Sequence, residues 1–461
     1  MVLELSEGEL RERLRRGEIT AAVYGLGNVG LPLVVAWLEA GARVIGVDIE
    51  VDKVATLNRG KAPTVEPGVA EAIKRFRANG RFEATVDGVD ASRRASVKLI
   101  AVPTLLREDR RFDGTAVEEA LRTVGRGLKR GDLVSMECSV PPGFTEKTGR
   151  IILEGESRLK AEDDFGLCAS PERIYVGRAL EDISSRYPKV VGGVGERSTR
   201  ALAALYESIA ERGVVRMSSA AAAEASKLFE GIYRDVNIAL ANELAILCRE
   251  MGLDYMEVRE AANSQPFCHL HVPGCGVGGV CIPYYPYFMA EAAAEVGVEL
   301  PLTLQARRIN EEMPEYTVKI AVKAAEEEGI EMKDSKVVIM GLAYRGGASD
   351  ARGSPTYEIA QLIQRLSASV KVHDPLIRED ETLRRLAIPL MGSVEEAIEG
   401  VSVVVFATDH GEYSRLDMGA FSQGLKKPAV IVDCRSIFKS PVIPPSVRYV
   451  RIGRGVKEQT C

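Results

Sequence analysis

A glycine pattern near the start of the chain, Gly25-Leu-Gly27-Asn-Val-Gly30, constrains the fold more than any other feature of the sequence. It lies between an apolar segment and a helical pattern, and a second apolar segment follows, over residues 20–24, 32–40 and 43–48. A strand, a glycine turn, a helix and a second strand form a βαβ unit, which places its two strands parallel in one sheet. The sequence therefore predicts an α/β fold that begins with a doubly wound, Rossmann-like domain.

The spacing of the three glycines predicts a dinucleotide site in this turn. Gly25 permits a tight turn, Gly27 lets the backbone approach a pyrophosphate, and Gly30 packs the helix on the strand. Asp48 ends the next strand, where a carboxylate accepts hydrogen bonds from ribose hydroxyls and repels a 2′-phosphate. We therefore predict NAD rather than NADP as the cofactor. The alternative is a Rossmann-like turn that binds no phosphate.

The length of 461 residues predicts two or three domains, because a single core rarely serves a chain of this size. Apolar segments that we expect to extend the same parallel sheet follow the first unit, at residues 97–102, 133–137 and 189–191. Two long helical patterns come next, at residues 220–251 and 300–328. Strand patterns then resume, at residues 336–340, 370–373, 403–407 and 430–433.

This alternation predicts two Rossmann-like doubly wound domains joined by a central helical domain. We place the first, NAD-binding domain at residues 1–215, the central domain at 216–329 and the second Rossmann-like domain at 330–461. Residues 455–461 are expected to form a frayed tail.

Composition excludes several classes of protein. With 46% hydrophobic and 27% charged residues and a formal net charge of −6, the chain has the balance of a soluble globular protein, and neither nucleic acid nor an anionic membrane is an expected partner. No apolar run approaches a membrane span, and residues 1–19 lack the apolar stretch of a signal peptide. The eight cysteines form no Cys-x-x-Cys pair, so we predict free thiols and a cytoplasmic location.

One of these cysteines, Cys281, follows a glycine-dense segment with glycines at 274, 276, 278 and 279. Such a loop tolerates positive φ angles and lets a ligand approach the backbone closely. This context indicates a nucleophile presented to a substrate. The alternative is a small core residue, which is the usual place for an unpaired cysteine.

A lysine on the first long helical pattern is the second chemical candidate. Lys227, Gly231 and Arg234 are spaced i, i+4 and i+7, so they share one helix face. Near Cys281, the ammonium would stabilise a thiolate and a developing oxyanion. Away from it, Lys227 would simply extend to solvent.

A metal site is a third possibility. Five potential ligands lie within fourteen residues: Cys268, His269, His271, Cys275 and Cys281. Their spacing matches no common zinc motif, so we predict no metal.

The sequence contains a series of motifs that follow one another in the order typical of one protein family. They are Gly25 to Gly30, Ile100-Ala-Val-Pro103-Thr104, Ser139-Val-Pro-Pro-Gly-Phe-Thr-Glu146, Ser170-Pro-Glu172-Arg173, Lys227 with Arg234-Asp-Val-Asn-Ile-Ala-Leu-Ala-Asn-Glu243, Gly278-Gly-Val-Cys281-Ile-Pro283, Gly341-Leu-Ala-Tyr-Arg345, Asp350-Ala-Arg352 and Ser354-Pro355. The chain resembles the UDP-glucose/GDP-mannose dehydrogenases over nearly its whole length. The resemblance is strongest to the branch that oxidises UDP-N-acetylmannosamine or UDP-N-acetylglucosamine.

The resemblance implies a double oxidation of the sugar C6 hydroxyl to a carboxylate, with two NAD⁺ and one water consumed. It assigns Cys281 to a covalent adduct with the aldehyde, since the tetrahedral adduct can release a hydride and leave a thioester. Lys227 would stabilise the alkoxide of this adduct, and Glu172 would act as a base or orient the water. Ser139 keeps a hydroxyl where the family usually has threonine.

The same resemblance implies binding residues and an assembly. The cofactor would contact Gly25, Gly27, Asn28, Val29, Gly30, Asp48, Lys53, Thr104 and Ser139. The UDP-sugar would contact Arg173, Ile174, Lys227, Arg234, His271, Gly274, Gly278, Arg345 and Arg352. The central helices imply a homodimer.

Several positions depart from the family pattern. Gly231 and Tyr285 stand where the family has an asparagine and an aspartate that assist the reaction. Phe267 replaces an arginine, Val280 a histidine next to the cysteine, and Gln265 a common histidine. The alternative function is therefore a catalytically impaired paralogue that binds a UDP-sugar.

Overall fold

The computed structural model of the protein describes residues 1–439 and 441–455, so residues 456–461 of the expected tail lie outside the described part. The chain folds into two compact units. The first unit comprises Met1–Glu230 and Tyr287–Glu299. The second unit comprises Gly231–Pro286 and Leu300–Cys461.

An eight-stranded sheet forms the centre of the first unit. Its order is β10-β9-β8-β7-β4-β1-β2-β3. The strands are β1 (Thr20–Tyr24), β2 (Arg43–Val47), β3 (Phe82–Thr85), β4 (Val97–Ile100), β7 (Leu133–Met136), β8 (Gly166–Ala169), β9 (Lys189–Gly193) and β10 (Val214–Arg216). From β3 to β8 neighbouring strands pair in parallel, and most of their side chains are buried, which explains the continuous apolar runs in the sequence.

The expectation of a wholly parallel sheet is wrong at one edge. Strand β9 pairs antiparallel with β8, where Cys168 lies opposite Gly193 and Ala169 opposite Gly192. A parallel pair needs a crossover that carries the chain back to the opposite edge of the sheet. The segment between β8 and β9 instead contains only α8 (Ala179–Glu181) and one π-helical turn, and β9 starts at the edge where β8 ends.

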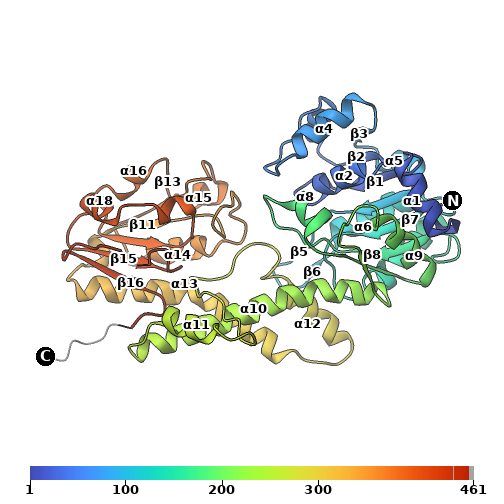
Figure 1. Ribbon diagram of the computed structural model, residues 1–461. Coiled ribbons are helices and arrows are strands. Elements are labelled where there is room, and N and C mark those ends of the chain that lie inside the picture. Colours follow the sequence, from blue (N-terminus) through green and yellow to red (C-terminus); the bar gives the residue numbers. More distant parts are fainter. Residues whose placement is uncertain (440, 456–461) are drawn as a thin grey trace. The chain divides into compact units, whose positions relative to one another are not determined.

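Helices cover both faces of this sheet (Figure 1). They are α1 (Glu7–Arg15), α2 (Gly30–Glu39), α3 (Val51–Asn58), α4 (Val69–Ala78), α5 (Gly88–Arg94), α6 (Thr115–Gly127), α7 (Arg150–Ser157), α8 and α9 (Glu196–Tyr206). A two-stranded hairpin, β5 (Leu105–Leu106) and β6 (Phe112–Asp113), follows β4. The hairpin packs through Phe112, whose ring contacts Phe144 and Phe288 edge to face.

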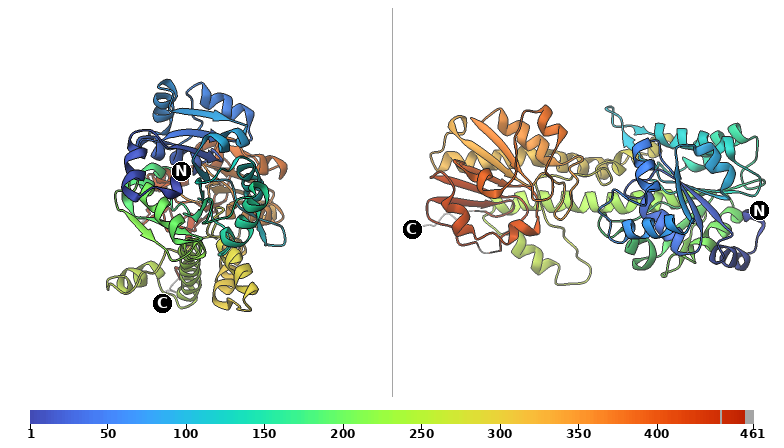
Figure 2. Two further views of the ribbon diagram at one scale, coloured as in Figure 1. Left: turned by 90° about the vertical axis from the view of Figure 1, so that its right-hand side faces the viewer. Right: turned by 90° about the horizontal axis from the view of Figure 1, so that it is seen from above.

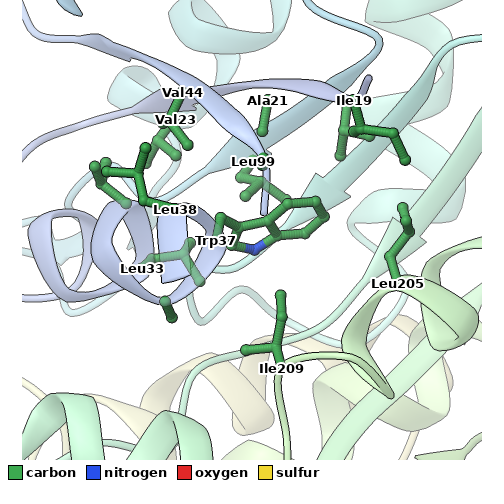
Figure 3. Packing of buried hydrophobic residues seen from close by; sticks show 14 of the residues in the cluster. Ile19, Ala21, Val23, Leu33, Trp37, Leu38, Val44, Leu99, Leu205 and Ile209 are labelled. Atoms are coloured by element: carbon green, nitrogen blue, oxygen red, sulfur yellow. The ribbon is translucent and has the colours of Figure 1, made fainter. Parts of the chain in front are cut away.

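The core of the first unit is built around Trp37 of α2, which is completely buried (Figure 3). Its indole meets the ring of Tyr206 edge to face at a centroid distance of 5.6 Å. Ile19, Leu99 and Leu205 belong to the same buried cluster. Burial of such large apolar side chains contributes roughly 1.5–3 kcal/mol each and fixes helix α2 on the sheet.

Four helices follow in the middle of the chain: α10 (Ala220–Glu250), α11 (Tyr255–Ala262), α12 (Tyr285–Glu295) and α13 (Pro301–Glu327). In the second unit, α10 and α13 are joined by buried polar contacts. Arg307 donates to Asp235 at 2.8 Å, and Asn242 donates to Asn310 at 2.9 Å. These pairs fix the register of the two long helices.

The second unit contains a six-stranded sheet in the order β13-β12-β11-β14-β15-β16, and every neighbouring pair is parallel. The strands are β11 (Lys336–Met340), β12 (Ser369–His373), β13 (Leu390–Met391), β14 (Val403–Phe406), β15 (Ala429–Asp433) and β16 (Val447–Arg451). The helices after β11 are α14 (Pro355–Gln364), α15 (Glu381–Arg385), α16 (Val394–Ile398), α17 (Gly411–Ser414) and α18 (Met418–Gln423). The fan of these strands is visible from above in Figure 2.

The predicted fold class is confirmed: two Rossmann-like sheets are joined by a helical segment. In the part of the chain that the structure describes, no helix combines the length and the apolar character needed to cross a bilayer.

Candidate active site

Many of the predicted residues of the first unit lie along one edge of its sheet. Because β2, β1, β4, β7 and β8 are parallel neighbours, their carboxyl ends share that edge. Taken in this order, the strands are followed by Asp48, by the Gly25–Gly30 turn with Asn28 and Val29, by Thr104, by Ser139, and by Glu172, Arg173 and Ile174. The strand order reverses between β1 and β4, which is where Rossmann folds bind dinucleotides.

The glycine turn has the geometry that a pyrophosphate requires. Gly25 adopts a φ of 91°, which favours glycine. A Cβ at Gly30 would lie 1.8 Å from the Gly25 carbonyl oxygen, so only glycine permits this helix to start so close to the strand. A Cβ at Gly27 would meet no atom within 4 Å, so the backbone here faces open space. The turn thus fits NAD, with its pyrophosphate against Gly27 and the start of α2.

Asp48 is held in place at the end of β2 and faces the turn. Its carboxylate accepts hydrogen bonds from the amides of Leu26 at 2.9 Å and Glu50 at 3.0 Å, and from the ammonium of Lys53 at 3.1 Å. Burial works to raise the pKa of Asp48, but these hydrogen bonds outweigh it and the pKa is lowered. The carboxylate is therefore ready to accept from ribose hydroxyls. Next to it, Ile49 is 94% exposed, an apolar residue that sequence reasoning did not single out.

The loop after β7 is anchored by a residue that the sequence did not single out, Glu224. Its carboxylate accepts hydrogen bonds from the amides of Gly143 at 2.7 Å and Thr145 at 3.0 Å. Burial raises the pKa of Glu224 to about 7. Since Glu224 precedes Lys227 by one helical turn in α10, the loop that carries Ser139 is tied to the helix that carries the lysine. Both Ser139 and Lys227 are half-buried.

Glu172 is buried, and its carboxylate forms an ion pair with the ammonium of Lys189. Arg173 lies 3.6 Å from the carboxylate of Glu230 and places its guanidinium 5.1 Å from the centre of the Tyr187 ring. The two residues therefore differ: Glu172 is fixed inside the unit, whereas Arg173 is partly exposed.

Cys281 is exposed in the second unit, so it is not a core residue. Its carbonyl accepts hydrogen bonds from the amides of Tyr284 and Tyr285, both at 3.1 Å. These bonds start helix α12, and the thiol consequently lies at a helix N-terminus, where negative charge is favoured. The structure thus presents an exposed thiol beside the start of a helix.

The glycines before Cys281 have two different roles. Gly276 and Gly279 adopt φ angles of 135° and 84°, which explains why these positions are glycine. The expectation of positive φ is wrong for Gly274 and Gly278, which are small because of close neighbours. A Cβ at Gly278 would lie 2.7 Å from the carbonyl oxygen of Gly353. The loop is therefore pressed against the segment that precedes α14.

An arginine missed by sequence reasoning, Arg435, lies against the start of this loop. A Cβ at Gly274 would come within 2.5 Å of its Nη1 atom, and its Nη2 atom is 3.5 Å from the carboxylate of Asp409. The amide of Gly274 also donates to Asn242 at 2.9 Å. The loop is thereby fixed between α10 and the carboxyl edge of the second sheet.

Two predicted arginines belong to the same region of the second unit. The carbonyl of Arg352 accepts a hydrogen bond from Gly279 at 2.9 Å, and its guanidinium is held by Asp350 at 2.6 Å. The hydrogen bonds that Arg352 donates to the Asp350 carboxylate raise the pKa of Arg352. Arg345 follows β11 and is partly buried. The two guanidinium groups therefore bring positive charge to this part of the second unit.

An aspartate also ends the second strand of this sheet. Asp374 is fully buried and accepts hydrogen bonds from the amides of Leu342 and Ala343, both at 2.8 Å. His410 contacts the same carboxylate oxygen at 3.1 Å. All of these contacts are internal, so Asp374 supports the turn after β11 and does not face a ligand.

Two of the departures from the family pattern, Gly231 and Tyr285, are in direct contact. Tyr285 is buried, and its ring packs against α10 at Gly231. A Cβ at Gly231 would lie 2.2 Å from Cδ2 of that ring. The tyrosine therefore fills the space that a side chain at position 231 would need, which joins the two substitutions into one packing arrangement.

The other predicted positions lie apart from this contact. Arg234 is half-buried on α10, and burial lowers the pKa of the nearby His271. Phe267 is 96% exposed, and Val280 is half-buried. Over residues 1–439 and 441–455, no three acidic, histidine or cysteine side chains converge to hold a metal.

Three domain models of the UDP-glucose/GDP-mannose dehydrogenase family match the chain: the NAD binding domain at residues 19–210, the central domain at 221–312 and the UDP binding domain at 338–440. The UDP-N-acetyl-D-mannosamine dehydrogenase of Pyrococcus horikoshii is 35% identical over 434 residues, which are 94% of this chain and 99% of that protein. The UDP-N-acetyl-D-glucosamine 6-dehydrogenase of Pseudomonas aeruginosa is 33% identical over 87% of this chain and 93% of its own. The solved structure of the Pyrococcus horikoshii UDP-D-ManNAc dehydrogenase superposes with a TM-score of 0.87 at 32% identity, covering 95% of this chain and 99% of that one.

Proposed function

Since the chain belongs to the UDP-glucose/GDP-mannose dehydrogenase family, we propose that it oxidises the C6 hydroxyl of a UDP-N-acetylhexosamine to a carboxylate. The protein is an NAD-dependent UDP-sugar dehydrogenase. The finer proposal is a four-electron oxidation that proceeds through a thioester on Cys281. It consumes two NAD⁺ and one water for each sugar.

The observation that carries this proposal is the placement of Cys281. A thiol that is exposed at a helix N-terminus, on a loop fixed against the UDP binding domain, is suited to attack a bound sugar aldehyde. A simple alcohol dehydrogenase needs no such group. The second oxidation does need it, because the adduct turns the trigonal aldehyde carbon into a tetrahedral carbon that can release hydride.

In each oxidation NAD⁺ supplies the acceptor for one hydride. The ammonium of Lys227 is assigned to the alkoxide that forms on the adduct, and loss of such a donor typically costs about 3 kcal/mol of transition-state stabilisation. Glu172 is assigned to the proton transfers and to the water that releases the thioester. Ser139 would contact the cofactor from the loop after β7.

The uridine diphosphate is assigned to the cationic edge of the second sheet. Arg345 and Arg352 were predicted there, and Arg435 joins them because its guanidinium lies against Gly274. Arginines bind phosphate oxygens in pairs and give the diphosphate a fixed orientation. We infer a UDP-N-acetylmannosamine-like sugar because the Pyrococcus horikoshii relative is named for that substrate.

A stoichiometric assay tests this function. NADH formation would be followed with UDP-N-acetylmannosamine, UDP-N-acetylglucosamine and UDP-glucose, for the natural chain and for Cys281→Ser. Two NADH for each sugar, abolished by Cys281→Ser, is the expected result. No NADH with any sugar, together with measurable UDP-sugar binding, would overturn it.

A second candidate function is a UDP-sugar-binding protein with impaired turnover, and the contact between Tyr285 and Gly231 favours it. The tyrosine ring fills the space where the family asparagine side chain would lie. Loss of one oxyanion donor lowers turnover by about 10² to 10³. In this case binding of UDP-sugar and NAD would persist while NADH formation is slow.

The double variant Gly231→Asn, Tyr285→Asp separates the two candidates. We expect higher turnover in the double variant if these positions limit the rate. Gly231→Asn alone is expected to destabilise the protein, because its Cβ would overlap the tyrosine ring. Equal turnover in the natural chain and a folded double variant would contradict a rate limit at this contact.

We also propose that the protein forms a homodimer through α10. Four apolar side chains on this helix are exposed at spacings close to whole turns, Phe229, Tyr233, Leu240 and Leu247, and the exposed Met251 directly follows its end. An exposed apolar stripe of this length is typical of an interface. Sedimentation of Leu247→Glu should show a monomer, whereas a natural chain that is already monomeric would overturn the proposal.

The division into functional segments at 1–215, 216–329 and 330–461 stays our proposal for the roles of the three regions. The cytoplasmic location likewise stays a prediction. A limited-proteolysis map and cell fractionation, respectively, would check these two statements.

A further inference from the structure

Three ionisable side chains are buried together behind the carboxyl edge of the first sheet. Glu137 follows β7, Glu172 follows β8, and Lys189 begins β9; their side chains are only 0%, 4% and 5% exposed. The Lys189 ammonium donates to Glu137 at 2.9 Å and to the Ser170 carbonyl at 2.9 Å, and it also bonds Oε1 of Glu172. The Lys189 ammonium thus forms ion pairs with both carboxylates.

The far side of this cluster is closed by hydroxyl groups. Oε1 of Glu137 accepts hydrogen bonds from Ser135 at 2.6 Å and from Tyr206 of α9 at 2.7 Å. The Tyr206 ring also lies 4.7 Å from the ammonium of Lys189. Glu137 is therefore fixed from three directions, whereas the Glu172 end of the cluster lies at the edge of the sheet.

Three further titratable neighbours keep their protons at neutral pH, while the adjacent Arg173 guanidinium lies beside Glu230 and the Tyr187 ring. Burial raises the pKa of the Cys138 thiol to about 12, and it raises the pKa values of Cys168 in β8 and of Tyr206. Burial also raises the pKa of Glu137, while the Lys189 charge opposes this and the Glu172 charge adds to it. The charge balance at Glu172 is consequently set by two groups, one of each sign.

Such groups titrate together. A like charge nearby makes a carboxylate hold its proton more strongly, and an opposite charge makes it hold the proton less strongly. Removal of Glu137 or of Lys189 should therefore move the titration of Glu172 in opposite directions. In the pH profile of kcat these opposite shifts appear only if Glu172 exchanges a proton during turnover, so a cluster that only stabilises the fold would leave that profile in place.

We propose that Lys189 and Glu137 are positioning residues for the oxidation, in which Lys189 fixes the Glu172 carboxylate and Glu137 sets how strongly that carboxylate holds a proton. This inference rests on the proposed function, because it assumes that Glu172 transfers protons during turnover. It extends the site inward by two residues that contact neither the sugar nor the cofactor.

The test is the pH profile of kcat for Glu137→Gln and Lys189→Met. Because an ionised Glu172 is required, Glu137→Gln should shift the acidic limb to lower pH and Lys189→Met should shift it to higher pH, each by about 1 pH unit. Lys189→Arg should restore the natural limb. Limbs that stay in place, or that move in the same direction, would overturn the proposal.

The chain offers a matched control in a second buried lysine. Lys98 of β4 forms an ion pair with Asp132 in the same unit and is fully buried. Lys98→Met should lower the melting temperature as Lys189→Met does, yet leave the acidic limb in place. A limb that also moves in Lys98→Met would assign the shifts to general destabilisation and would overturn the proposal.

Failure of this inference is distinguishable from failure of the proposed function. An active natural chain with unmoved limbs retains the function and removes the inference. If the natural chain forms no NADH, the function fails, and carbon-13 NMR of glutamate carboxyls still tests the cluster, with the Glu172 signal assigned by Glu172→Gln. A lower titration midpoint of Glu172 in Glu137→Gln supports the inference, and an unchanged midpoint overturns it.

Discussion

The two Rossmann-like sheets carry an aspartate at the same topological place, and they use it differently. Asp48 ends β2 and bonds the amide of Leu26, while Asp374 ends β12 and bonds the amide of Leu342. In both sheets the aspartate ties the turn after the central strand to the neighbouring strand. His410 also contacts the Asp374 carboxylate. Asp374 is fully buried, whereas Asp48 keeps a small exposed surface.

The turn beside Asp48 is also more open than the turn beside Asp374. The first turn continues from Leu26 to Gly27, where a Cβ would meet nothing within 4 Å. The second turn continues from Leu342 to Ala343, which is buried. An aspartate after the second strand is therefore a structural brace in both units. Only beside Asp48 does the turn leave the backbone open, which is the arrangement that our proposed dinucleotide site requires.

The largest expected effect follows from the buried aspartate. Asp374→Ala would leave the amides of Leu342 and Ala343 without an acceptor in the interior, and it would unpair His410. We expect a loss of about 4 kcal/mol in the free energy of unfolding. Denaturant unfolding would measure it, with Asp48→Ala as the matched control at about 1 kcal/mol. Equal losses would remove the distinction between the two aspartates.

One glycine in each turn gives the next effect: Gly341 starts the second turn, and Gly27 lies inside the first. Gly341 has a φ of 108°, and a Cβ there would lie 2.4 Å from Cβ of Thr408, so Gly341→Ala should cost about 3 kcal/mol of stability. Gly27→Ala should change the unfolding free energy by less than about 0.5 kcal/mol, because its Cβ faces open space. Thermal unfolding of both variants checks the contrast, and a severe loss in Gly27→Ala would contradict it.

The substitutions in the first unit, which cost little stability, should have the larger effect on NADH binding. Asp48→Ala removes an ionised acceptor for the ribose hydroxyls and should weaken NADH binding by about tenfold or more. Gly27→Ala should also weaken NADH binding, because its methyl group would lie in the path of the pyrophosphate. Titration calorimetry with NADH is the measurement. Unchanged affinity in Asp48→Ala would show that the first aspartate is only a brace.

The smallest effect is a dependence on pH. Burial works to raise the pKa of Asp374, but the hydrogen bonds from His410 and from the amides outweigh it and the pKa is lowered from 3.8. A lowered folded pKa contributes stability that is present above the unfolded value and is lost as pH falls below it. The unfolding free energy should therefore decline below about pH 4, less steeply in Asp374→Asn. An unchanged slope would contradict the role of this carboxylate.

The sequence predicted the aspartate and the turn of the first sheet, but not those of the second. The repeated glycines and Asp48 stand in one short motif, so a local pattern was enough. Asp374 has no such motif beside it, and its partner His410 comes 36 residues later in the chain. Arg435 was missed for the same reason, because its contact with Gly274 joins two distant segments.

Helices and strands were predicted well where a continuous apolar run or a long helical period marks them. The direction of β9 was not, because an apolar strand has the same composition in either direction and only the short connection from β8 decides it. Packing between substituted positions was equally invisible. Nothing local to Gly231 or Tyr285 reveals that one fills the space left by the other.

That contact also constrains how the two positions can be changed. With Tyr285 in place, a β-carbon at position 231 would overlap the tyrosine ring. A substitution of Gly231 alone therefore introduces a clash, and a smaller residue at position 285 alone leaves a gap beside α10. Only a joint exchange avoids both costs, so the two positions behave as a single unit in mutagenesis of the cysteine loop.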